Sequence, residues 1–168
     1  MKKSLIALAL FAASGASMAQ GLYAFGSVGS QSIDKSVADL STSATQFQGG
    51  MGVKLNPNLA LEASWVQASH STSFSDVSLD VEGVIAGVRG TYPLNETVAL
   101  TGKAGLTFLS ADLGGVASSD GMGFLVGIGA EYKLNPTVSL TANYDIYNKP
   151  ADLLVDLSVF SVGLKYQF

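Results

Sequence analysis

Few side chains in this sequence of 168 residues could take part in chemistry. There is no cysteine, which excludes thiolate catalysis and disulfides, and no metal-ligand spacing or phosphate-binding loop occurs. The single histidine, His70, stands in the run Ser69-His70-Ser71-Thr72. A histidine with a serine could support nucleophilic catalysis, but serine is common in loops. We therefore expect His70 to be a solvated loop residue, and we predict no catalytic, cofactor or metal site.

Charged residues are also scarce, at 13% of the chain. Many of the acidic ones fall in four polar stretches that contain only two lysines, Lys35 and Lys149. The aspartates there are Asp34, Asp39, Asp76, Asp80, Asp112, Asp120, Asp152 and Asp156. Such oxygen ligands could hold divalent cations shared with lipopolysaccharide, but we expect ordinary solvated loop charge.

The N-terminus carries the pattern of an export signal. Lys2 and Lys3 precede the apolar run Leu5–Ala13, and Ser17-Met18-Ala19 has small residues at the positions required for cleavage. We predict a signal peptide over residues 1–19 and a single domain over residues 20–168. The domain has more acidic than basic residues, which argues against nucleic acid as a partner.

The remaining chain is apolar without a helix that could span a membrane. Hydrophobic residues make up 48% of the sequence, yet no run of 18 apolar residues exists. Apolar residues instead recur at every second position, which is the period of a β-strand. Eight segments show this alternation: Leu22–Ser30, Phe47–Leu55, Leu59–Trp65, Gly83–Leu94, Val98–Phe108, Met122–Leu134, Thr137–Tyr147 and Ser158–Phe168.

The connections between these segments alternate in length. Three are short turns built on Asn56-Pro57-Asn58, Asn95-Glu96 and Asn135-Pro136. The four others are longer and polar, near 33–42, 69–80, 111–120 and 148–156. Short turns at one end and long loops at the other are typical of outer-membrane barrels. A propeller has a similar period, but it needs four strands per repeat and its signatures are absent.

The glycine-rich, charged face of the segments would be a poor surface for a soluble barrel. In hydrocarbon the apolar face points outward to lipid and the glycine-rich face points into the barrel. The sheet must also close on itself, because no backbone group can stay unpaired in lipid. Aromatic residues on that face form two groups, as the girdles of a membrane barrel would. They are Tyr92, Tyr132, Tyr166 and Phe168 near the short turns, and Phe47, Phe108, Phe124, Tyr144 and Phe160 near the long loops. The predicted fold is all-β, an eight-stranded antiparallel up-and-down transmembrane β-barrel.

The signal peptide, Gly26-Ser27-Val28-Gly29, the eight-strand rhythm and the end Gly163-Leu164-Lys165-Tyr166-Gln167-Phe168 carry a family resemblance. The chain resembles the small outer-membrane β-barrels of Gram-negative bacteria, including opacity-type and porin-family barrels and the barrel of outer-membrane protein A. The resemblance implies an outer-membrane location among outer-membrane lipids and lipopolysaccharide. It also implies export with periplasmic chaperones, recognition of Tyr166 and Phe168 by the β-barrel assembly machinery, and a monomer.

Eight strands leave an interior just wide enough for side chains. Its charged residues are Lys54, Glu62, Arg89, Lys103, Glu131, Lys133, Asp145 and Lys165, with the lysines 54, 133 and 165 nearest the mouth. Because buried charges must be paired or solvated, we expect Glu62 and Glu131 to bridge to Arg89, Lys103 and Lys165 and to plug the lumen. Inward glycines leave room for water, so a narrow pore remains an alternative. These glycines are Gly50, Gly52, Gly83, Gly87, Gly105, Gly123, Gly127, Gly129 and Gly163.

The function predicted from these features is structural or a surface interaction of adhesin type. A minor channel for ions or small solutes is the alternative. A third possibility is an enzyme, because two barrels of this kind modify lipids and both need a histidine with a serine. Here Thr72 occupies the place where the deacylase pattern has its serine.

Overall fold

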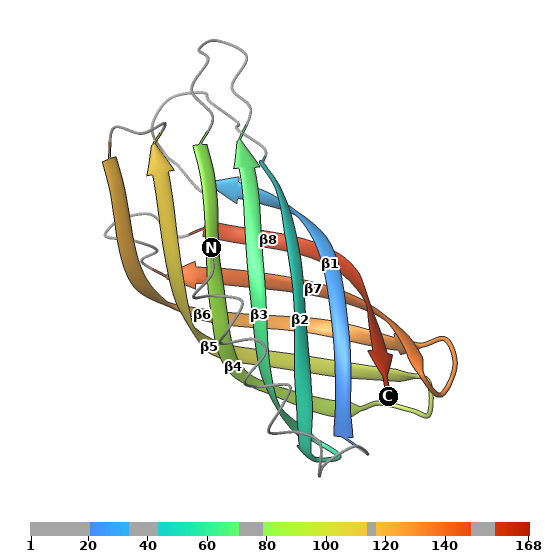
Figure 1. Cartoon of the computed structure of the whole chain (residues 1–168). Helices are drawn as coiled ribbons and strands as arrows, with labels where there is room; N and C mark the ends of the chain where they lie inside the picture. Colours follow the sequence, from blue (N-terminus) through green and yellow to red (C-terminus); the bar gives the residue numbers. More distant parts are fainter. Residues whose placement is uncertain (1–20, 34–43, 71–78, 114–116, 149–156) are drawn as a thin grey trace.

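The computed structural model describes residues 21–33, 44–70, 79–113, 117–148 and 157–168. The predicted signal peptide lies outside these residues. Within them no helix is long and apolar enough to cross a membrane. The chain forms eight strands (Figure 1): β1 (Leu22–Ile33), β2 (Ala44–Asn56), β3 (Leu59–His70), β4 (Leu79–Pro93), β5 (Val98–Leu113), β6 (Ala117–Lys133), β7 (Val138–Asn148) and β8 (Leu157–Gln167).

The strands close into a barrel in chain order. Each strand pairs antiparallel with the next one, and β1 pairs with β8. Following paired residues once around from Leu22 of β1 leads back to Ser32, ten residues further along the same strand. Such an offset accompanies the strand tilt of ~35–45° that closing a small barrel requires. The predicted fold is confirmed.

The two faces of the wall differ as the alternation predicts. Along β7, buried and exposed positions alternate from Ser139 to Asn148 with few exceptions. Most large apolar side chains on the outer face are exposed, and the largest exposed fraction among them is the 70% of Ile128. All nine aromatic residues assigned to the two girdles are exposed on this face. An exposed apolar outer wall fits a sheet that is solvated by lipid rather than water.

The short turns follow from their asparagines. Asn95 Oδ1 accepts hydrogen bonds from the backbone N–H groups of Thr97 and Val98, at 2.9 and 2.7 Å. Asn135 makes the same two contacts in the turn between β6 and β7. An asparagine side chain that bonds to the backbone ahead of it reverses the chain within a few residues. In the first turn Asn56 Oδ1 accepts from Asn58 N, beside a register shift between Lys54 and Asn56.

The strands run further at the long-loop end than the sequence predicted. β5 continues to Leu113 and β6 begins at Ala117, so most of the loop expected over 111–120 is a paired hairpin. β3 and β4 likewise pair as far as His70 and Leu79. Apolar residues at alternate positions mark only the part of a strand in contact with lipid, whereas backbone pairing can continue in water. Polar residues then replace apolar ones on the outer face: Ser30, Thr45, Gln67, Glu82, Asn148 and Ser158.

Candidate functional site: the lumen of the barrel

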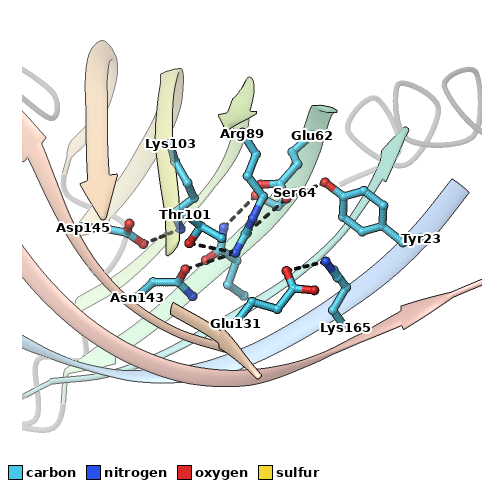
Figure 2. Close-up of polar contacts among 11 residues, drawn as sticks. Tyr23, Glu62, Ser64, Arg89, Thr101, Lys103, Glu131, Asn143, Asp145 and Lys165 are labelled. Carbon is cyan, nitrogen blue, oxygen red and sulfur yellow. Dashed lines mark hydrogen bonds and ion pairs between the residues drawn. The ribbon is translucent and has the colours of Figure 1, made fainter. Parts of the chain in front are cut away.

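Six buried or nearly buried charged side chains, three cations and three anions, meet inside the barrel (Figure 2). Arg89 Nη1 lies 3.2 Å from Glu62 Oε1. Lys103 Nζ lies 2.6 Å from Asp145 Oδ2, and Lys165 pairs with Glu131. The described lumen charges therefore balance, as buried charges must.

Arg89 is the centre of this network. From β4 its guanidinium also reaches Thr101 Oγ1 of β5 and Asn143 Oδ1 of β7, both at 3.4 Å. Asn143 lies across the lumen, so this contact spans the barrel rather than following the wall (Figure 2). A guanidinium presents several donors in a fixed plane. Arg89 can therefore link its own strand, β4, to β3, β5 and β7 at once.

Tyr23 is a member of the cluster that the sequence analysis did not select. Its ring is 1% exposed, and its hydroxyl donates a hydrogen bond of 2.7 Å to Glu62 Oε1. The Lys165 ammonium lies 5.2 Å from the centre of the ring, a cation–π contact. The alternation in β1 already places Tyr23 on the inner face. Its position along the barrel axis, level with the charged side chains, could not be read from the sequence.

The structure brings together two of the expected pairs, Glu62 with Arg89 and Glu131 with Lys165. Lys103 differs, because its partner is Asp145 rather than a glutamate. The register explains the choice: Lys103 is paired with Gly127 of β6, and Gly127 is paired with Asp145 of β7. With no side chain between them on β6, the ammonium and the carboxylate meet directly.

Lys54 and Lys133 do not join the cluster. Both are exposed at the short-turn end of the barrel, and none of the ion pairs among the described residues includes them. They lie at the mouth, as their positions near the turns indicated, and are solvated there.

An apolar layer lies above the charges, toward the long-loop end. It consists of inward side chains that contact one another: Val66, Ile85, Leu109, Leu125, Tyr147 and Val159. Gln46 of β2 donates a hydrogen bond of 3.2 Å to the hydroxyl of Tyr147 of β7, across the lumen. This layer was not predicted from the sequence, in which most inward positions are small, polar or charged. The inward parity of Ile85, Leu125 and Val159 was the available signal.

Neighbouring side chains occupy the space beside two of the inward glycines. A Cβ atom at Gly52 would meet the ring of Tyr23, and one at Gly127 would meet the Asp145 carboxylate. Large side chains therefore fill the space that these glycines provide. One cavity of about 20 Å³, enough for a single water, lies beside Glu62, Ser64 and Lys103. Packing at these two glycines favours the plug over the narrow pore, which stays the alternative.

The two other groups of predicted residues lie outside the lumen chemistry. Tyr166 and Phe168 are exposed on the outer face at the short-turn end, with ring centroids 5.2 Å apart in an edge-to-face arrangement. His70 ends β3, where its backbone pairs with Leu79. Ser71 and Thr72 lie outside the described residues. Among the described residues no cluster of His, Cys, Asp or Glu could hold a metal ion.

Comparison with known proteins identifies the family. A family model described as the outer membrane protein beta-barrel domain matches residues 4–168. No curated protein sequence matches the chain.

Solved structures share the fold at low sequence identity. Neisserial surface protein A is 20% identical with a TM-score of 0.71, over 88% of this chain and 97% of that one. The attachment invasion locus protein Ail of Yersinia pestis is 20% identical with a TM-score of 0.64, over 89% and 99%. The N-terminal barrel of Pseudomonas aeruginosa OprF is 13% identical with a TM-score of 0.56, over 88% and 98%. Because the family model covers almost the whole chain, the chain belongs to the outer membrane protein beta-barrel family and is an integral protein of the Gram-negative outer membrane.

Proposed function

We propose that this protein is a closed outer-membrane scaffold that presents its long-loop end at the cell surface for interaction with other molecules. The observation that carries the proposal is the filled lumen. Among the described residues, three ion pairs lie in one layer of the lumen and a cluster of apolar side chains lies in the next. Paired charges and packed apolar side chains oppose the passage of a hydrated ion, which favours a role for the surfaces outside the lumen.

The structural relatives support a surface role by analogy. One is named as a surface protein of Neisseria, and another is an attachment invasion locus protein. Ail was also crystallised with sucrose octasulfate, a heparin analogue. The long connections of this chain hold many aspartates against two lysines, Lys35 and Lys149. Like charges repel, so a polysulfate is a poor ligand here and a basic surface is a better one.

A channel and an enzyme are the competing functions. The channel requires water through the apolar layer that includes Ile85 and Leu125. The enzyme requires a nucleophile beside His70, the only histidine of the sequence. We also propose that the outward pair Tyr166 and Phe168 serves the assembly machinery, and that the barrel acts as a monomer among lipopolysaccharide.

Conductance in planar bilayers tests the closed scaffold. We expect no stepwise current from the purified chain, and none from Arg89→Ala, because the apolar layer still seals the lumen after that change. Stepwise currents from the unchanged chain would refute a closed barrel. Currents that appear only in Arg89→Ala would assign the network as an ion gate.

Adherence tests the surface role. Bacteria that lack the protein, bacteria with it restored, and bacteria with residues 71–78 replaced by glycine and serine are compared on cultured epithelial cells. We expect restored cells to adhere better than both others. Equal adherence of all three strains contradicts the surface role. Mass spectrometry of lipid A from the same strains detects the alternative, a lipid-modifying activity.

A further inference from the structure

Two inward glycines, Gly87 of β4 and Gly105 of β5, lie directly opposite one another in the barrel wall. Glu62 of β3 is paired with Gly87, and Leu125 of β6 is paired with Gly105. The two middle positions of this row across the wall therefore carry no side chain. A recess is left between the Glu62 side chain at one end of the row and the Leu125 side chain at the other.

The space at this glycine pair differs from the space at Gly127. A Cβ atom at Gly127 would first meet the carboxylate of Asp145, which fills the position. At Gly87 and Gly105 the nearest atoms to such a Cβ are all backbone atoms of the paired strand. The cavity of about 20 Å³ lies here, and both glycines line it. The missing side chains are thus not replaced by a neighbouring one.

The polar groups beside the cavity keep hydrogen-bonding capacity (Figure 2). The two hydrogen bonds described for Glu62 both end on Oε1, and a carboxylate can accept about four. The Lys103 ammonium has several donors, and the hydrogen bond described for it goes to Asp145. Ser64 accepts a hydrogen bond of 2.8 Å from Gln48, which leaves its own O–H to donate. An anionic acceptor and two kinds of donor therefore border one small space.

The size and the charge of the surroundings select the ligand of this cavity. A volume of about 20 Å³ is enough for one water. The three cations and three anions of the described lumen already balance, so a bound ion of either sign would add an unpaired charge. A neutral molecule that donates and accepts at once fits between a carboxylate and an ammonium, and water is the molecule of this size that does so.

We propose that the cavity at the glycine pair is a binding site for one water molecule, which donates to Glu62 and accepts from Lys103. The described hydrogen bonds join Glu62 to Arg89 and Lys103 to Asp145. The water connects these two ion pairs, so that they act as one unit. The inference goes beyond the proposed surface role and does not depend on it, because adherence does not report on the lumen.

A single water at this site does not make an aqueous lumen. The cavity is also lined by Ile85 and Leu125, which belong to the apolar layer. Apolar side chains give water no hydrogen-bond partner, and a bound water needs two to four polar partners. The site therefore fixes one water beside the charges and does not begin a column of water through the apolar layer.

Magnetisation transfer from water to glycine Hα protons tests the site, on the full barrel in phosphatidylcholine nanodiscs with ¹³C-labelled glycine. We expect Gly87 and Gly105 to receive a signal from a long-lived water. Gly102 is the matched control, because it is exposed on the outer face and meets lipid rather than the lumen. Signals at Gly87 and Gly105 no larger than the signal at Gly102 would overturn the proposal.

Substitutions of Ser64 separate a bound water from exchange through the hydroxyl and ammonium protons of the protein. Ser64→Thr adds one methyl group, which takes up about the space of one water, and it keeps the hydroxyl that bonds to Gln48. The signals at both glycines should then be lost. Ser64→Ala removes the hydroxyl and enlarges the cavity, so the signals should be retained. Ser64→Val fills the cavity if Ser64→Thr does not assemble, and signals retained in both filling variants would refute a bound water.

A double-mutant cycle tests the connection between the two ion pairs. The effect of Glu62→Gln and Lys103→Met together on the unfolding equilibrium constant should differ from the product of their separate effects by about threefold or more. Repeating the cycle in Ser64→Thr, where the water is displaced, should reduce that factor. A factor of the same size in both backgrounds would overturn the bridging water, because direct attraction between Glu62 and Lys103 would then explain the coupling.

Discussion

The ion pair between Lys103 and Asp145 offers a quantitative test of whether the lumen is dry. Asp145 is buried to 1% exposure and the Lys103 side chain to 9%, with 2.6 Å between Nζ and Oδ2. Removing one member of a buried pair leaves an uncompensated charge and costs about 3–5 kcal/mol. In a water-filled channel the same pair would be worth only about 0–1 kcal/mol. The two environments therefore predict clearly different results.

The perturbation is a double-mutant cycle of Lys103→Met and Asp145→Asn. We expect each single variant to lower the free energy of unfolding by about 3–5 kcal/mol. The double variant should lose less than either single one, because no charge is left unpaired. Glu96→Gln is a control at an exposed turn carboxylate and should change stability by less than about 0.5 kcal/mol.

The assay is urea unfolding in phospholipid vesicles, followed by tryptophan fluorescence. Trp65 is the only tryptophan, and it lies on the outer face of β3 at 36% exposure. Its emission shifts when it passes from lipid to water. Additive losses of less than about 1 kcal/mol in the single variants would refute the buried network and favour an aqueous lumen.

Two further predictions test the outer and inner walls. Val162→Arg places a charge on the lipid face of β8 and should cost about 2–4 kcal/mol in the same unfolding assay; a cost near zero would contradict the assignment of that face to lipid. Gly127→Ala should lower stability by about 1–3 kcal/mol, because the added methyl group meets the Asp145 carboxylate. Its matched control is Gly102→Ala on the outer face, where the nearest atom to a Cβ is 3.9 Å away, and stability should be retained there. Equal effects of the two alanines would contradict the packing described for the lumen.

The fold was predictable because one physical rule acts on every strand. Lipid outside and side chains inside impose a strict alternation, and residues such as Phe160, Val162 and Leu164 display it without knowledge of their neighbours. The turns were predictable for a similar local reason, because Asn95 and Asn135 bond to the backbone only two or three residues ahead.

Partners inside the lumen were less predictable, because they depend on the register and tilt of the whole barrel. The alternation along the strands places Lys103 and Asp145 on the inner face. Only the registers of β5 with β6 and of β6 with β7 show that Gly127 lies between them. Tyr23 was passed over because it carries no charge, although it lies against Glu62 and Lys165. The apolar layer was not predicted either, because its members are single residues from separate strands that meet only when the barrel closes.

The upper limits of the strands were mispredicted because hydropathy reports lipid contact rather than backbone pairing. Gln67 and Glu82 are polar residues opposite one another on the outer face, yet β3 and β4 stay paired beyond them. A pattern that requires apolar residues ends each strand at this level. The hairpin of β5 and β6 continues above it to Leu113 and Ala117.

The same change of solvent explains why the pairing of β6 with β7 is needed within the membrane. Within hydrocarbon every backbone group needs a partner, so β6 and β7 stay paired from Lys133 to Phe124. Above Asn148 water removes that requirement, and β6 extends beyond its neighbour at no similar cost. The membrane-embedded part therefore closes through backbone pairing, whereas the hairpin of β5 and β6 can continue above it to Leu113 and Ala117.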